Sequence, residues 1–119
     1  MAEAPHDREA GVSADFDREQ YLYLTTRGRK SGRPRQIEIW FTHRLGRFYV
    51  IAEYATSHWL KNLQATPEVE VRVGTHNFSG QARALSEVED ADLVRAVQEL
   101  SQAKYGWGDG VVVELTPRA

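Results

Sequence analysis

A short stretch between two apolar runs concentrates positive charge. Five of the fifteen Lys and Arg residues fall within residues 27–35, although the 119-residue chain has a formal net charge of -2. Two glycines and a proline interrupt this stretch, which predicts a turn. Such a turn presents backbone N–H groups beside guanidinium and ammonium groups, and this combination can bind phosphate or carboxylate. The alternative is a solvated hairpin tip that keeps a sheet edge soluble. The basic residues are Arg27, Arg29, Lys30, Arg33 and Arg35.

A second segment that could contribute to chemistry is the sequence Tyr-Gly-Trp-Gly-Asp-Gly at residues 105–110. Three glycines around two aromatic residues could form a mobile flap over a ring-shaped ligand. The interpretation we favour is a helix end and turn whose aromatic side chains close one end of the fold. Within the segment, Tyr105 is the best candidate for a hydroxyl that donates to a substrate. His58 could bind a ligand or donate a proton, or be a partly exposed histidine with no role.

Composition excludes several kinds of chemistry. The chain has no cysteine, which rules out disulfides, thiolate metal sites and cysteine nucleophiles. Its four histidines lack the spacing of metal ligands, so we predict no metal site. The net negative charge and the narrow basic stretch argue against nucleic acid as a partner. No apolar run approaches the length that spans a bilayer, and we expect a cytoplasmic protein.

The pattern of apolar residues predicts a mainly β fold in a single domain. Residues 1–17 are polar and acidic, and we expect a flexible N-terminal arm, with Phe16 as an anchor, before a domain over residues 18–119. We expect a short helix over residues 57–65 and a longer one over 87–104, opened by a capping box at Ser86. About six mostly antiparallel strands with few helices favour a small barrel. The predicted strands are residues 21–26, 36–42, 48–52, 69–73, 78–85 and 111–115, with a hairpin turn at 43–47.

Two motifs carry a resemblance to a known family. The sequence LTTRGRKSGRPR at residues 24–35 and the sequence WLKNLQATPEV at residues 59–69 resemble the signature of the deazaflavin-dependent nitroreductase family. The resemblance covers about residues 21–85. It implies a split β-barrel, related to pyridoxamine-phosphate-oxidase-like and flavin-reductase-like proteins. It also implies an oxidoreductase that uses reduced coenzyme F-420 to deliver a hydride to a quinone, a nitro compound or an activated alkene.

The same resemblance implies a set of cofactor-binding residues. The loop residues of the set would hold the phosphate and anionic tail of F-420, and two helix residues would lie beside the same groove. The backbone of two strand residues would face the deazaflavin ring. One departure is the segment 53–58, which is shorter than the glycine-rich segment of many family members. In chain order the set is Arg29, Lys30, Ser31, Gly32, Arg35, Ile51, Ala52, Trp59 and Asn62.

Other functions and an assembly state also follow from the sequence as hypotheses. Within the same fold, the chain could instead bind flavin mononucleotide (FMN) or haem. From a different class, a non-catalytic module could bind RNA or an acidic protein through its basic loop. We expect a homodimer, because small split barrels often bury one sheet face against a second copy.

Overall fold

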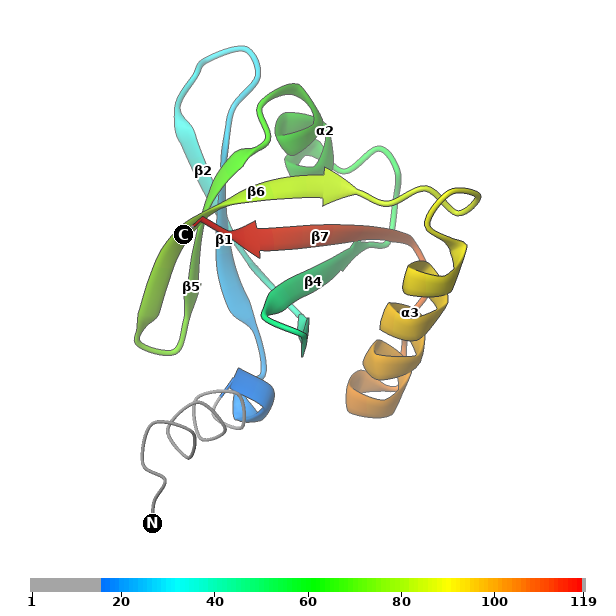
Figure 1. The fold of residues 1–119 in the computed structure, drawn as a ribbon. Helices are drawn as coiled ribbons and strands as arrows, with labels where there is room; N and C mark the ends of the chain where they lie inside the picture. The colour runs from blue at the N-terminus through cyan, green and yellow to red at the C-terminus, as the bar shows by residue number, and fades with distance from the viewer. Residues whose placement is uncertain (1–15, 119) are drawn as a thin grey trace.

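The computed structural model describes residues 16–118, and within them the strands form one antiparallel sheet. The order of its seven strands is β2-β1-β5-β6-β7-β4-β3. Residues 16–18 are helical, and two longer helices lie outside the sheet (Figure 1). The elements are β1 (Leu22–Arg27), β2 (Pro34–Ile39), β3 (Thr42–Arg44), β4 (Arg47–Ala52), α2 (His58–Ala65), β5 (Glu68–Val73), β6 (His76–Ala84), α3 (Ala91–Tyr105) and β7 (Val111–Pro117).

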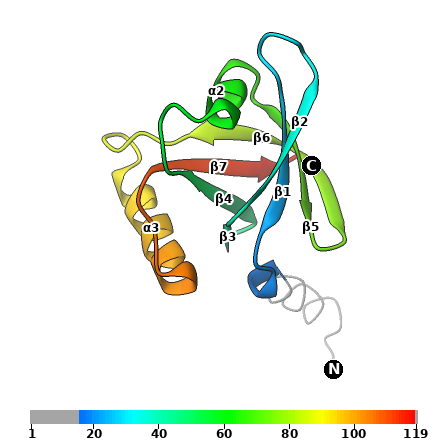
Figure 2. The ribbon, with the colours of Figure 1, turned by 180° about the vertical axis from the view of Figure 1, so that it is seen from behind.

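The sheet curls because its two end strands are neighbours along the chain. β2 and β3 stand at opposite ends of the strand order, yet only Trp40 and Phe41 separate them. The two ends of the sheet must therefore come close together, and the sheet bends into a half-open barrel (Figure 2). This architecture confirms the expected mainly β split barrel with a short helix and a longer one.

β4 shows how the two faces of the sheet are used. Phe48 and Val50 point into the barrel core, where they pack with Leu22, Leu24 and other strand residues. The alternate residues of β4 belong to a second apolar cluster, which the buried side chains of α3 complete on the outer face of the sheet. β4 is thus buried on both faces, as the continuous apolar run predicts.

The chain between residues 36 and 47 differs from the sequence-based expectation. We expected one strand over 36–42 and a turn over 43–47, but the strand breaks at Trp40 and Phe41 and Thr42–Arg44 forms β3. The break is held from α3, because Lys104 Nζ donates to the Phe41 carbonyl oxygen at 3.1 Å. A contact 63 residues away along the chain leaves no local signal in the sequence.

The start of the longer helix was also misplaced. Ser86 does not open it: the Ser86 hydroxyl accepts the N–H groups of Val88 and Glu89, both at 3.1 Å. Asp90 closes the same turn, because its carboxylate accepts the Ser86 N–H at 2.8 Å. The helix α3 begins only at Ala91. Its end agrees with the prediction, since Gly106 adopts the left-handed conformation with φ 78°.

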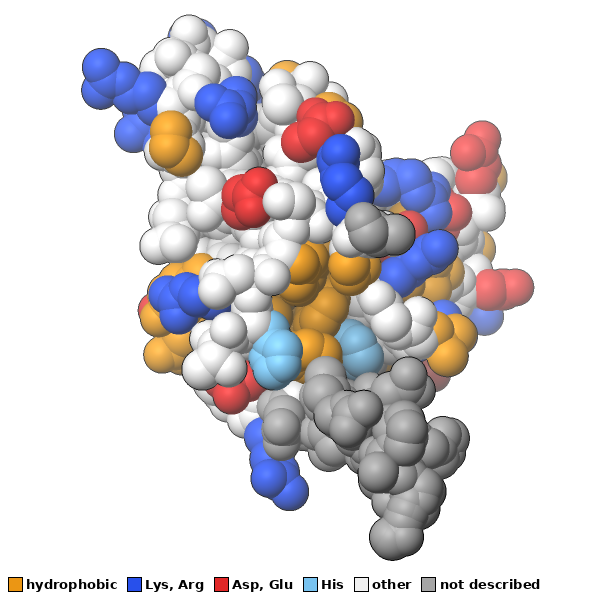
Figure 3. Space-filling view, turned by 60° about the vertical axis from the view of Figure 1, so that its left-hand side comes forward, with side chains coloured by type: hydrophobic (Ala, Val, Ile, Leu, Met, Phe, Trp, Pro, Cys, Tyr) orange, Lys and Arg blue, Asp and Glu red, His pale blue; other side chains and the backbone are white. Residues whose placement is uncertain are grey.

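The predicted arm lies, for its first fifteen residues, outside the described residues. Phe16, the expected anchor, packs edge-on against Phe48 with ring centroids 5.0 Å apart. The rings of His43 and His76 lie 5.2 and 5.1 Å from Phe16. Figure 3 shows a group of hydrophobic side chains flanked by two histidines on this face. Among the described residues, no helix is both long and apolar enough to cross a membrane.

Candidate functional site

The loop between β1 and β2 is fixed to α2 through the buried side chain of Asn62, and Arg29 of the loop also contacts His58 at the start of α2. Asn62, 5% exposed, accepts hydrogen bonds at Oδ1 from the backbone N–H of Arg29 (3.3 Å) and from its guanidinium (2.8 Å). The Asn62 amide nitrogen donates to the hydroxyl of Thr26 at 3.2 Å. Both views of the fold place the loop and α2 at the same end of the barrel (Figures 1 and 2). Asn62 therefore positions the loop, and its amide is largely used within the protein.

The loop also closes on itself and leaves two donors free. The N–H of Gly28 donates to the Arg33 carbonyl and the N–H of Gly32 to the Gly28 carbonyl, each at 2.8 Å. Gly32 adopts a φ of 73°, which few other residues tolerate. Among the described residues, the N–H groups of Lys30 and Ser31 have no hydrogen-bond partner. Two adjacent free N–H groups at a loop tip form an anion-binding arrangement.

These elements border an open groove of about 680 Å³, which we call the cationic groove. Three of its lining side chains are positively charged and none is a carboxylate. Lys30 and Arg35 form no ion pair with any described residue, and the Arg29 guanidinium contacts Asn62 and His58 but no carboxylate of the described residues. The positive charge of the groove is therefore not neutralised by any carboxylate of residues 16–118. The lining residues are Gly28, Arg29, Lys30, Ser31, Arg35, Ile37, Ser57, His58, Trp59 and Asn62.

A second open groove, of about 600 Å³, shares Ser57 and Trp59 with the first. We call it the aromatic groove, because all three tryptophans of the chain line it. It carries two carboxylates and no positively charged residue. Both volumes lie in the range of small-molecule sites. The lining residues are Glu38, Ile39, Trp40, Ile51, Glu53, Tyr54, Ser57, Trp59 and Trp107.

The structure brings most of the predicted cofactor-binding residues together. Ile51 lines the aromatic groove. Gly32 and Ala52 line neither groove: Gly32 shapes the loop, and Ala52 is buried in the barrel core. Six members of the set line the cationic groove, namely Arg29, Lys30, Ser31, Arg35, Trp59 and Asn62.

Tyr105, the candidate hydroxyl donor, lines neither groove. Its hydroxyl accepts the Phe41 N–H at 3.0 Å and lies 2.7 Å from the Gln20 carbonyl oxygen and 2.8 Å from that of Phe41. Burial raises the pKa of Tyr105, so the hydroxyl keeps its proton. The Tyr105 ring stacks on Trp40 with centroids 4.4 Å apart. Tyr105 thus fixes the corner between β2 and β3 and positions a tryptophan of the aromatic groove.

Sequence reasoning missed the aromatic groove itself. Trp40, Trp59 and Trp107 come from three distant segments, and each has a separate local explanation as a core, helix or turn residue. Trp40 is 43% exposed and lines the groove. Only the fold shows that the three side chains share one surface, so no local signal could have found it.

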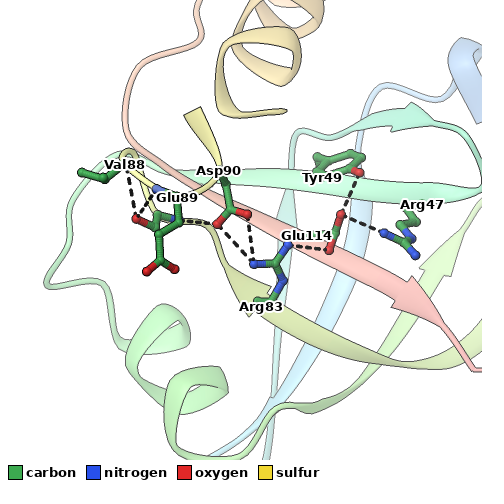
Figure 4. Close-up of polar contacts among 8 residues, drawn as sticks. Arg47, Tyr49, Arg83, Val88, Glu89, Asp90 and Glu114 are labelled. Atoms are coloured by element: carbon green, nitrogen blue, oxygen red, sulfur yellow. Dashed lines mark hydrogen bonds and ion pairs between the residues drawn. The ribbon is translucent and has the colours of Figure 1, made fainter. Parts of the chain in front are cut away.

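A buried charge network on the outer face of the sheet was also missed. Glu114, 4% exposed, accepts a hydrogen bond from the Tyr49 hydroxyl at 2.9 Å (Figure 4). Arg47 and Arg83 reach the same carboxylate at 3.3 and 3.4 Å, and Arg83 also pairs with Asp90 at 3.2 Å. Burial, followed by the bond to Glu114, raises the pKa of Tyr49. Each arginine here has a carboxylate partner, unlike the cations of the cationic groove.

Within residues 16–118, no three His, Cys, Asp or Glu side chains gather as metal ligands would.

Solved structures of the same fold define the class. A candidate pyridoxamine 5'-phosphate oxidase from Listeria innocua is 17% identical and matches 94% of each chain with a TM-score of 0.72. An F-420-H2 dependent reductase is 22% identical over 81% of this chain and 92% of its own, with a TM-score of 0.64. A haem storage protein from Vibrio cholerae is 17% identical over 100% of this chain and 92% of its own, with a TM-score of 0.62. The chain is therefore a split barrel of the pyridoxamine-phosphate-oxidase-like type.

The family follows from the sequence match. The model of the F-420H(2)-dependent quinone reductase family matches residues 2–112, which is nearly the whole chain. The protein belongs to this family. It is accordingly an oxidoreductase that uses coenzyme F-420, which confirms the activity class and the cofactor that the motifs implied.

Proposed function

We propose that the cationic groove holds the phosphate and anionic tail of F-420, and that the aromatic groove holds its ring together with the electron acceptor. The observation that carries this proposal is the unneutralised charge of Lys30 and Arg35 beside the free N–H groups of Lys30 and Ser31. Such donors suit a phosphate, because charge-assisted hydrogen bonds to phosphate are the strong ones. The residues present therefore fit the coenzyme.

The connection between the grooves supports a single bound molecule. Ser57 and Trp59 line both grooves, so one ligand with an anionic tail and a flat ring can extend from one groove into the other. When bound, reduced F-420 supplies a hydride. The protein's own contribution is to orient the ring against the acceptor and to exclude water with the aromatic side chains. The acceptor we propose is a quinone, a nitro compound or an activated alkene.

A fluorescence titration with F-420 tests the proposed cofactor site. Lys30→Ala and Arg29→Ala each remove one cation, and each should weaken binding about tenfold or more, since a hydrogen bond to a charged group contributes about 1.5–3 kcal/mol. Arg95→Ala is the matched control, because Arg95 is exposed on α3 and lines neither groove. FMN titrated in parallel should bind more weakly.

Two results would contradict the proposed site. One is the absence of F-420 binding at tens of micromolar. The other is an affinity that is the same in Lys30→Ala, Arg29→Ala and Arg95→Ala. Unfolding curves of each variant establish that it is folded, which matters most for Arg29 because its side chain contacts Asn62.

The homodimer and the cytoplasmic location remain predictions. Sedimentation of the purified protein at micromolar concentration tests the first, and a monomer there would refute it. Fractionation of the native cells tests the second.

A further inference from the structure

The two adjoining grooves differ in the sign of their charge. The cationic groove contains Arg29, Lys30 and Arg35 and no carboxylate, whereas the aromatic groove contains Glu38 and Glu53 and no Lys, Arg or His. Neither carboxylate has a hydrogen bond or an ion pair with any residue in the described part of the chain. The negative charge of the aromatic groove is therefore available to a ligand, as the positive charge of the other groove is.

The aromatic lining points to the same ligand chemistry. Trp40, Trp59, Trp107 and Tyr54 line the groove, and Tyr54 is 64% exposed. The faces of tryptophan and tyrosine rings attract cations, and tryptophan does so most strongly. Ring faces beside free carboxylates form a surface that favours a flat, positively charged molecule and disfavours an anion.

We propose that the aromatic groove selects flat aromatic acceptors that carry a positive charge, such as a quaternary ammonium or protonated amine, over anionic acceptors of the same ring. This inference rests on the proposed function, because it names the class of molecule that enters the acceptor site. It also explains how the coenzyme is oriented: its anionic tail is attracted to the cationic groove and repelled from the acceptor end.

Binding to the protein without coenzyme tests the preference directly. The probes are two naphthalenes that differ only in a trimethylammonium or a sulfonate substituent. Trp40 and Trp107 line this groove but not the cationic groove, so their indole N–H signals in a nitrogen-15 NMR spectrum report on this site. We expect the cationic probe to shift these signals and to bind about twofold to fivefold more tightly than the anionic probe, which is the scale of exposed charge pairs.

Charge-neutral variants identify the residues responsible. The double variant Glu38→Gln/Glu53→Gln keeps the side-chain shape, and both residues are exposed, so the fold should persist. It should lose the preference for the cationic probe. Glu99→Gln, an exposed carboxylate on α3 that lines neither groove, should retain it. Equal binding of the two probes, tighter binding of the anion, or a preference that survives in the double variant would overturn the proposal.

Turnover separates this proposal from the proposed function. With reduced F-420 as the hydride donor, kcat/KM for a naphthoquinone bearing trimethylammonium should exceed that for its sulfonate analogue, and the ratio should fall in the double variant. If F-420 binds to the loop but the probes show no charge preference, only the acceptor proposal fails. If the probes show the preference but F-420 does not bind, only the cofactor site fails.

Discussion

Two sets of basic residues in this barrel have opposite surroundings. Arg47 and Arg83, on the outer face of the sheet, reach the buried carboxylate of Glu114, and Arg83 also reaches Asp90. Lys30 and Arg35, at the cationic groove, have no carboxylate partner among the described residues. The first set is neutralised by the protein and contributes to its stability. The charges of the second set are available to a ligand. What distinguishes a binding site from a structural network here is whether the cations have carboxylate partners, and not how many cations there are.

The largest effect should come from breaking the ion pairs of the first set, which we call the paired set (Arg47 and Arg83 with Glu114). Glu114→Ala removes the acceptor of the Tyr49 hydroxyl and the partner of two arginines, which should lower the free energy of unfolding by about 3 kcal/mol. Urea denaturation measures the change. Affinity for F-420 should stay the same, because no residue of the network lines either groove. Glu114→Gln, which keeps part of the hydrogen bonding, should lose less. If Glu114→Ala kept its stability but bound F-420 more weakly, then Arg47 and Arg83 would belong to the binding site and not to a structural network.

A smaller effect should follow from the residue that supports the unpaired set. Asn62→Ala removes the buried amide that binds Thr26 and Arg29, which should cost about 2 kcal/mol of stability. Unlike Glu114→Ala, it should also weaken F-420 binding, because the loop loses its attachment to α2. Lys61→Ala on the exposed face of α2 serves as the control for both measurements. If Asn62→Ala lowers the stability but leaves the F-420 affinity unchanged, then the loop does not need its Asn62 contacts to α2 to hold the coenzyme.

The smallest effect should appear in acid, again in the paired set. The backbone N–H of Ser86, and then Arg83, lower the pKa of Asp90 below the ordinary value of about 3.9. A lowered folded-state pKa contributes stability that is complete above the unfolded value and is lost as the pH falls through the folded one. The stability difference between the natural protein and Asp90→Asn should therefore narrow below about pH 4. Denaturation curves at several pH values measure it, and a constant difference would show that Asp90 is not held in this way.

The sequence was sufficient for features that depend on local geometry. The left-handed conformation of Gly106 agrees with the helix end and turn expected at residues 105–110. The position of β4 could be predicted from the apolar run at residues 48–52. The loop and α2 could be paired through the two motifs, although the motifs do not show that Asn62 joins them.

Most of the features that sequence reasoning missed depend on long-range contacts, and the turn at residues 86–90 is the local exception. β3 exists because Lys104 and Tyr105 hold the backbone of Phe41. In the turn at residues 86–90, the Ser86 hydroxyl accepts a backbone N–H group, as it would in a capping box. The Asp90 carboxylate accepts the Ser86 N–H, which favours this turn over the first turn of a helix. The aromatic groove and the Glu114 network join residues from several strands, and each member has an unremarkable local context.

The most direct test of the contrast between the two sets is an NMR titration of the nitrogen-15-labelled protein with F-420. The backbone amide signals of Lys30 and Ser31 should shift most, because their free N–H groups acquire an acceptor. Signals of the indole groups should move with them, while the amides of Arg47 and Arg83 should not. Shifts at Arg47 and Arg83 with an unchanged loop would contradict the account.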